Sequence, residues 1–134
     1  MIWEPITPEE LSLEISKGEK EMGSENFQFW NEIKFIPTKW TEHEFGDEGG
    51  GFWAVAKYKN FVFYYNDIEE GFNISEFEKD REIKEYGAEQ DELQFALMKL
   101  RKTKKRNLTV SLFLYHSIRI SFFLTRKTTL LKVR

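Results

Sequence analysis

The sequence of 134 residues predicts a single α+β domain, with a central antiparallel sheet, N-terminal helices and a C-terminal packing helix. Two aromatic runs separated by only two residues indicate a β-hairpin in the middle of the chain. A helix-capping sequence lies near residue 8, and apolar residues recur at helical spacing before residue 100. A hydrophobic content of 40% and an aromatic content of 16% supply a core, which excludes a disordered protein.

The first helix is expected to begin after Thr7. The Thr7 hydroxyl can cap the helix, Pro8 suits the first helical position, and Glu10 completes a capping box. The helix should end near Glu21, because Gly23 follows. Its apolar face is thin, so we expect it to lie on the surface of the domain.

A second, shorter helix should follow at once. Ser24 can cap it, and Phe27 and Trp30 are its apolar residues. Pro37 disfavours a helical conformation in the residue before it, so residues 33–36 should be extended.

An acidic loop and a hairpin are predicted next. Residues 41–51 combine four carboxylates with four glycines, which is typical of a mobile loop. The runs 52–58 and 61–65 are rich in aromatic and β-branched residues, as strands are. Lys59 and Asn60 between them favour a tight hairpin turn.

The chain after the hairpin is harder to interpret. Residues 66–73 have the composition of turns and should form a connector. The segment 75–86 is compatible with a short helix that starts at Ser75, or with a strand that contains Ile83 and Tyr86.

Residues 88–105 carry the clearest helical pattern of the chain. Acidic residues occupy the predicted first turn and basic residues the last, so both ends complement the helix dipole. The apolar residues recur at helical spacing and predict a face that packs on the sheet: Leu93, Ala96, Leu97 and Leu100.

The charges of the chain are divided along the sequence. Residues 1–92 hold all 23 acids and 9 bases, a net charge of −14, whereas residues 93–134 hold 11 bases and no acid. We therefore expect a domain over residues 1–106 and a basic, apolar tail over 107–134. The tail is compatible with two added strands, or with an extension that is not original to the domain. It is too polar to predict a membrane span.

Several classes of site are disfavoured by what the sequence holds. The chain has no Cys, which excludes disulfides and thiolate chemistry, and its two His lie far apart in the sequence. No motif predicts a catalytic residue, a metal site, a cofactor or a nucleic-acid site. The first residues lack the features of a signal peptide, so we expect a cytoplasmic protein.

Two acidic segments beside aromatic residues form the candidate site. Carboxylates of this kind would steer a basic protein partner, and tryptophans would anchor it. The candidate partner-binding residues are Trp40, Glu42, Glu44, Asp47, Glu48, Trp53, Asp67, Glu69 and Glu70.

Three stretches carry a resemblance to a known group. The residues at 37–40, the acidic loop with Phe52-Trp53-Ala54-Val55-Ala56, and the run 65–75 resemble those of small bacterial cytoplasmic proteins. These are similar in size and character to the immunity proteins of polymorphic toxin systems, such as the SUKH superfamily. The resemblance covers roughly residues 24–100. It implies an α+β domain that occludes a basic toxin domain, such as a nuclease, without catalytic residues.

Two other functions are compatible with the sequence. One is an interaction or regulatory module with an unrelated partner, because many acidic domains bind proteins other than toxins. The other is a hydrolase that uses a pair of carboxylates, which 23 acids make possible without identifying the pair.

Overall fold

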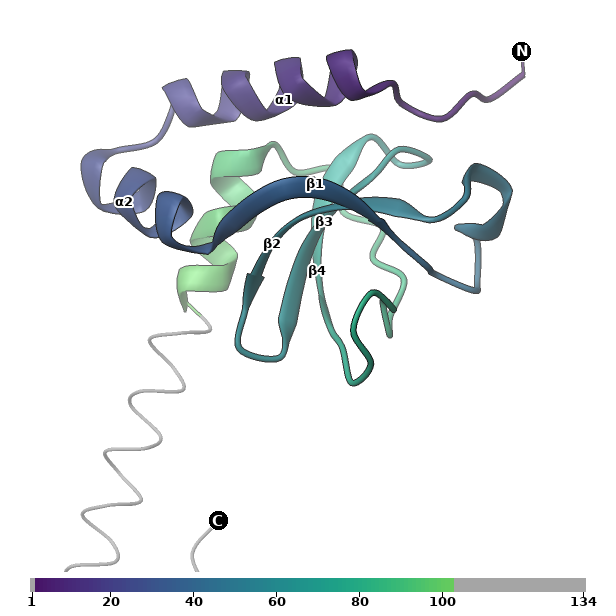
Figure 1. Cartoon of the computed structure of the whole chain (residues 1–134). Helices are drawn as coiled ribbons and strands as arrows, with labels where there is room; N and C mark the ends of the chain where they lie inside the picture. The colour runs from purple at the N-terminus through teal and green to yellow at the C-terminus, as the bar shows by residue number, and fades with distance from the viewer. Residues whose placement is uncertain (1, 103–134) are drawn as a thin grey trace, which may run out of the picture. The chain divides into compact units, whose positions relative to one another are not determined.

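Four antiparallel strands form the centre of the fold, in the order β1-β2-β3-β4 (Figure 1). The computed structural model describes residues 2–102, and the predicted tail at 107–134 lies outside them. The α+β prediction is confirmed, with two helices before the sheet and one after it. The elements are α1 Pro8–Lys20, α2 Ser24–Ile33, β1 Lys34–Trp40, the 3-10 turn η1 Asp47–Gly49, β2 Phe52–Tyr58, β3 Phe61–Asn66, β4 Gly71–Glu76 and a helix at 93–102.

Helices cover one face of the sheet. Trp30 of α2 contacts Phe63 of β3 with ring centroids 5.8 Å apart, and Phe63 contacts Phe72 of β4 at 5.7 Å. The beginning of the last helix contacts α1, since a Cβ atom on Gly18 would lie 2.4 Å from the Cβ of Leu93. Burial of each large aromatic side chain contributes on the order of 2–3 kcal/mol, so this layer stabilises the fold substantially.

The segment 77–91 covers the opposite face without regular secondary structure. Buried polar side chains of β3 and β4 replace the missing backbone partners, and we call them the polar rail: Tyr64, Asn66, Asn73 and Ser75. The Tyr64 hydroxyl donates to the carbonyl of Glu85 at 3.2 Å and accepts from the amide of Gly87 at 2.7 Å. Asn66 Nδ2 donates to the Gly87 carbonyl at 2.7 Å.

The rest of the polar rail holds the segment in the same way. Asn73 accepts from the amide of Glu89 at 2.9 Å and donates to its carbonyl at 3.0 Å. Ser75 Oγ accepts from the amide of Glu85 at 2.8 Å. Buried backbone groups need partners, and these side chains supply them where no strand or helix does. Gly87 permits the close approach, because a Cβ there would lie 2.5 Å from Asn73 Oδ1.

The predictions for the first half of the chain are largely confirmed. The capping box between Thr7 and Glu10 is formed at 3.0 and 3.1 Å. The hairpin has the predicted two-residue turn, in which Lys59 takes the positive φ of 53°. Two details are wrong: Gly23 is the N-cap of α2 and Ser24 its first helical residue, and Ile33 is still helical, so that only 34–36 of the predicted extended residues are extended.

The predictions after residue 66 need three corrections. Gly71 to Asn73 belong to β4 rather than to a connector, and Ser75 lies in β4 rather than in a helix. The residues 83–86 form no strand: the amide of Ile83 donates to the carbonyl of Thr41, and the backbone of Glu85 bonds to side chains of the polar rail. The last helix begins at residue 93 and not at 88, since residues 89–91 bond to β4 instead. The predicted helical residues 103–105 lie outside the described range.

Candidate functional site

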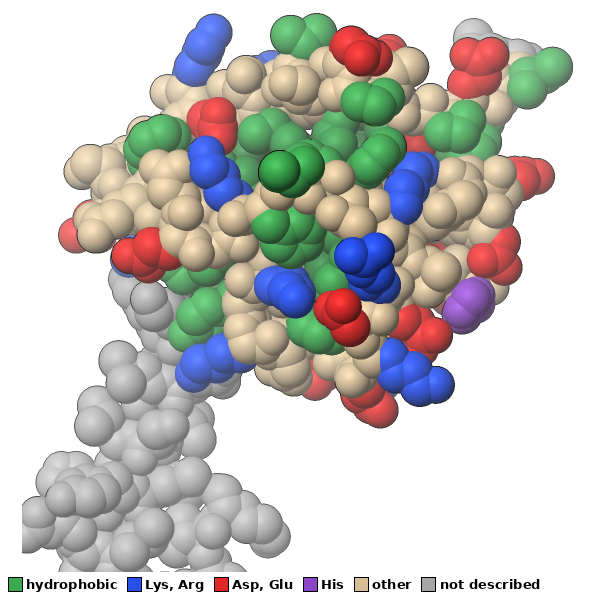
Figure 2. Space-filling model, in the orientation of Figure 1, with side chains coloured by type: hydrophobic (Ala, Val, Ile, Leu, Met, Phe, Trp, Pro, Cys, Tyr) green, Lys and Arg blue, Asp and Glu red, His purple; other side chains and the backbone are tan. Residues whose placement is uncertain are grey.

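The two acidic segments predicted from the sequence lie at the same end of the sheet. The strands are antiparallel and adjacent in order, so the β1–β2 loop at 41–51 and the β3–β4 turn at 67–70 emerge together. In Figure 2, acidic side chains gather on the right of the view, where Figure 1 shows the β1–β2 loop and the N-terminal segment. We call this region the acidic end and define it by its exposed or half-buried carboxylates, Glu44, Asp47, Glu48, Glu69 and Glu70.

The N-terminal segment joins the two acidic segments. Trp3 Nε1 donates to the carbonyl of Asp67 at 3.0 Å, and a Cβ on Gly49 would lie 2.9 Å from the Trp3 ring. Lys39 Nζ donates to the carbonyls of Gly49 at 2.8 Å and Gly51 at 3.2 Å. Burial lowers the pKa of Lys39, and the negative charge of Asp67 opposes this effect. Trp3 thus connects the β1–β2 loop to the β3–β4 turn, and Lys39 connects the loop to β1.

Glu42 has a structural role rather than the predicted steering role. Its side chain is only 3% exposed. The carboxylate accepts from the amides of Glu44 at 3.1 Å, Phe45 at 2.8 Å and Gly46 at 2.8 Å. The β1–β2 loop is therefore closed around a buried acid, in contrast to the open, mobile loop that its glycines predict.

The predicted tryptophan anchors are also turned inward. Trp40 is buried among core residues and contacts Phe77 edge to face at 5.0 Å. Trp53 is half-buried beneath Lys39, whose Nζ lies 5.1 Å from the indole centroid. Trp40 thus belongs to the core, and neither indole is a freely exposed anchor.

Asp67 is buried as well and does not act as an exposed charge. Its Oδ2 accepts from the amide of Ile6 at 2.8 Å, and its Oδ1 has no hydrogen-bond partner among residues 2–102. Burial raises the pKa of Asp67, although the Ile6 amide and the Lys39 ammonium oppose the effect.

A groove of about 430 Å³ adjoins the β3–β4 turn and combines carboxylates with apolar side chains. Ile2 is 89% exposed and Leu13 is 71% exposed, so both offer apolar surface to a partner. The groove lies between the N-terminal segment, α1 and the turn. Its lining consists of Ile2, Trp3, Glu4, Ile6, Glu10, Leu13, Glu14, Tyr65, Asp67, Ile68 and Glu70.

Tyr65, like Asp67, is a buried polar residue that lines this groove. It is only 6% exposed, and its hydroxyl forms no hydrogen bond to any residue of the described part of the chain. Burial raises the pKa of Tyr65 to about 12, and the neighbouring carboxylates of Glu14 and Glu70 add to the effect. The hydroxyl is therefore a protonated, unpartnered group within reach of several carboxylates.

Sequence reasoning missed part of this site. Ile2, Glu10 and Glu14 were not recognised, because their proximity to Glu70 depends on how α1 lies across the sheet end. Leu13 carried a usable signal, since it falls outside the apolar stripe that buries Leu11. An apolar residue on the solvent face of an amphipathic helix indicates a contact surface.

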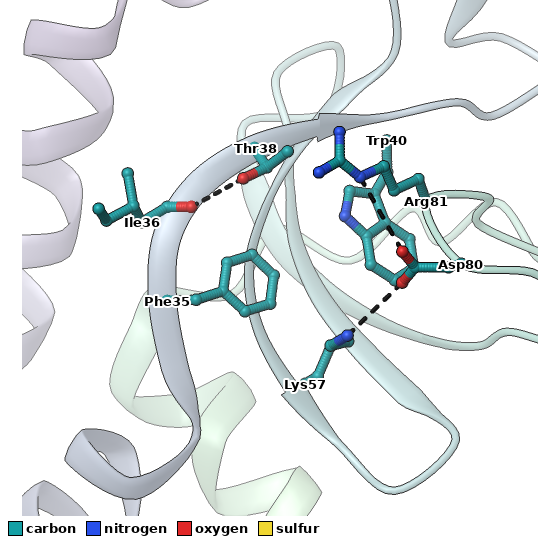
Figure 3. Close-up of a pocket in the computed structure, with 7 residues that line it drawn as sticks. All are labelled: Phe35, Ile36, Thr38, Trp40, Lys57, Asp80 and Arg81. Atoms are coloured by element: carbon teal, nitrogen blue, oxygen red, sulfur yellow. Dashed lines mark hydrogen bonds and ion pairs between the residues drawn. The ribbon is translucent and has the colours of Figure 1, made fainter.

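A second hollow lies beside the edge strand β1, and Figure 3 shows its lining residues. It measures about 530 Å³. Its charged groups pair with one another: Asp80 lies 3.5 Å from Lys57 Nζ and 3.9 Å from Arg81 Nε. Because this one acid faces two basic residues, the charged lining of the hollow is net positive and does not favour a basic partner.

Two carboxylates of the groove, those of Asp67 and Glu10, are poorly placed for acid–base chemistry. Asp67 Oδ1 is inaccessible to solvent, and Glu10 is engaged by Thr7, whose amide holds the pKa of Glu10 below its usual value. Between residues 2 and 102, no group of three or more His, Asp and Glu side chains is placed to hold a metal ion. Over the same range, none of the helices has the length and apolar character needed to cross a bilayer.

Comparisons with protein-family models, with curated proteins and with solved structures find no match to this chain. The function is therefore argued from the acidic end and its groove alone.

Proposed function

We propose that this domain binds a basic protein at its acidic end and acts by occlusion rather than catalysis, as an immunity-type protein of the bacterial cytoplasm does. The groove beside the β3–β4 turn carries the proposal, because it places several carboxylates next to exposed aliphatic side chains. Charge gives such a surface its selectivity, and apolar contact gives it affinity.

In this proposal the exposed acids attract the partner, and the apolar side chains beside the groove hold it on contact. Glu44, Asp47 and Glu48 on the β1–β2 loop attract a basic partner over roughly one Debye length, about 8 Å at physiological salt. Leu13 and Ile68 then bury apolar surface on contact.

A basic nuclease toxin suits this surface. A nuclease presents a positive surface to phosphate groups, and the carboxylates of an acidic protein can occupy that surface in their place. The resemblance of residues 24–100 to immunity proteins favours the same class of partner.

The proposal is tested with the full-length chain as bait in a native lysate, followed by calorimetry with the captured partner. The variant Glu69→Lys/Glu70→Lys reverses two charges of the acidic end. The matched control Glu21→Lys/Glu32→Lys makes the same change at the opposite end of the sheet, after α1 and near the end of α2.

We expect the acidic-end variant to lose about tenfold or more in affinity, and the control to stay within about twofold. Binding should also weaken between about 50 and 300 mM salt. An affinity that responds neither to salt nor to reversal at Glu69 and Glu70 would contradict the proposal.

A further inference from the structure

We propose that the groove beside the β3–β4 turn accepts one arginine side chain of the partner, with Tyr65 and Glu70 as its ligands. This inference rests on the proposed function and names the chemistry that the partner must present.

The first observation is the unpartnered Tyr65 hydroxyl. The side chain is more than nine-tenths buried and lines the groove, yet its hydroxyl bonds to no residue between 2 and 102. A Phe would fill the same space against Phe72, whose ring lies 4.8 Å away, so the Tyr65 hydroxyl adds a polar group to the groove wall that packing does not require. A hydroxyl in this position is suited to accept a hydrogen bond from a ligand that enters the groove.

The second observation is the backbone of Glu70. Its φ of 61° lies in the left-handed region, where Gly or Asn is more stable than Glu. The turn thus holds a carboxylate at a position that local stability disfavours, and that carboxylate acts electrostatically on the Tyr65 hydroxyl. Such conflicts between local preference and residue choice are typical of functional positions.

The arrangement of acceptors favours arginine over lysine. Glu14 approaches from α1, Glu70 from the turn and Tyr65 from β3, so the acceptors lie on three different elements. A guanidinium group offers five donors in a planar fork and is less strongly hydrated than an ammonium group. The exposed side chains of Leu13 and Ile68 can cover the aliphatic stem of the arginine.

The test uses the full-length chain and the blocked peptide acetyl-Leu-Arg-Leu-amide, with the same peptide carrying neutral citrulline as its control. Binding is followed by NMR, through the tyrosine ring carbons and the backbone amides of Glu10 and Glu70. We expect the arginine peptide to shift these resonances in a saturable manner, and the citrulline peptide to bind about tenfold more weakly.

Three variants locate the binding site. Tyr65→Phe should weaken the arginine peptide about three- to tenfold, since it removes only the hydroxyl. Glu70→Asn should weaken it similarly and raise the urea midpoint of the chain, so lost binding cannot be attributed to unfolding. Glu44→Gln, at the acidic end but outside the groove, should change the affinity by less than about twofold.

Equal binding of both peptides, or unchanged binding by Tyr65→Phe and Glu70→Asn, would overturn the inference. The arginine site and the proposed function can be contradicted independently of each other. If the captured partner responds to Glu69→Lys/Glu70→Lys but binds Tyr65→Phe normally, the acidic end remains the binding surface and the arginine site is wrong.

Discussion

Replacement of Glu42 by Ala should destabilise the domain without removing any of the carboxylates that define the acidic end. The Glu42 carboxylate accepts three backbone hydrogen bonds within the β1–β2 loop, at 2.8 to 3.1 Å, and is almost completely buried. The substitution leaves these three amides without their acceptor.

The predicted loss in the free energy of unfolding depends on whether each of the three amides lies in a buried or an exposed residue. Gly46 is buried, so its stranded amide costs about 1–3 kcal/mol. The residues Glu44 and Phe45 are exposed, so their amides can bond to water and each loses only about 0.5–1 kcal/mol. The sum predicts a loss of about 3 kcal/mol for Glu42→Ala. Glu42→Gln keeps an amide oxygen for Phe45 and Gly46, and should lose about 1–1.5 kcal/mol.

Urea unfolding of the full-length chain, followed by tryptophan fluorescence, measures these differences. Glu44→Ala is the matched control, because it removes a neighbouring acid whose side chain is exposed, and it should stay within about 0.5 kcal/mol of the wild type. The reasoning is refuted if Glu42→Ala and Glu44→Ala unfold at the same urea concentration.

Two further predictions concern the polar rail and Asp67. Gly87→Ala places a Cβ about 2.5 Å from Asn73 Oδ1, so it should lower the free energy of unfolding by about 2 kcal/mol or more, measured by urea unfolding. Gly23→Ala is its control, because a Cβ there meets no atom within 4 Å, and it should lower the free energy of unfolding by less than about 1 kcal/mol. Burial raises the pKa of Asp67 above its usual range, so the folded state binds this proton more tightly than the unfolded state does, and the contribution of Asp67 to stability falls as the pH rises through the folded pKa. Asp67→Asn should therefore melt at an equal or higher temperature than the wild type at pH 7, and this advantage should disappear below the unfolded pKa. A melting temperature of Asp67→Asn well below that of the wild type at pH 7 would contradict the predicted direction of this effect.

The parts of the fold that follow from local chemistry could be predicted from the sequence. The capping box of α1 needs only Thr7 and Glu10 at the right spacing, and the hairpin needs only two strands and a two-residue turn. The acidic segments at 42–48 and 67–70 meet because an antiparallel meander places every second connection at the same end of the sheet. Their proximity is a consequence of topology rather than of sequence spacing.

The remaining features depend on contacts between distant residues. A loop glutamate such as Glu42 has the same sequence signature whether it faces water or bonds to buried amides, so its burial could not be predicted. The segment 77–91 has no periodicity to detect, because its backbone bonds to separate partners in distant parts of the chain, among them the side chains of the polar rail at 85–89. Trp40 was misassigned for a similar reason, since Phe77 of that segment covers it.

The most direct test of the acidic end is the rate of association with the captured partner, compared between the two charge-reversed variants at low salt. If the acidic end steers the partner, Glu69→Lys/Glu70→Lys should associate about tenfold more slowly than Glu21→Lys/Glu32→Lys, and the difference should shrink as salt is added. Equal association rates for the two variants at low salt would contradict the assignment of the acidic end as the binding surface.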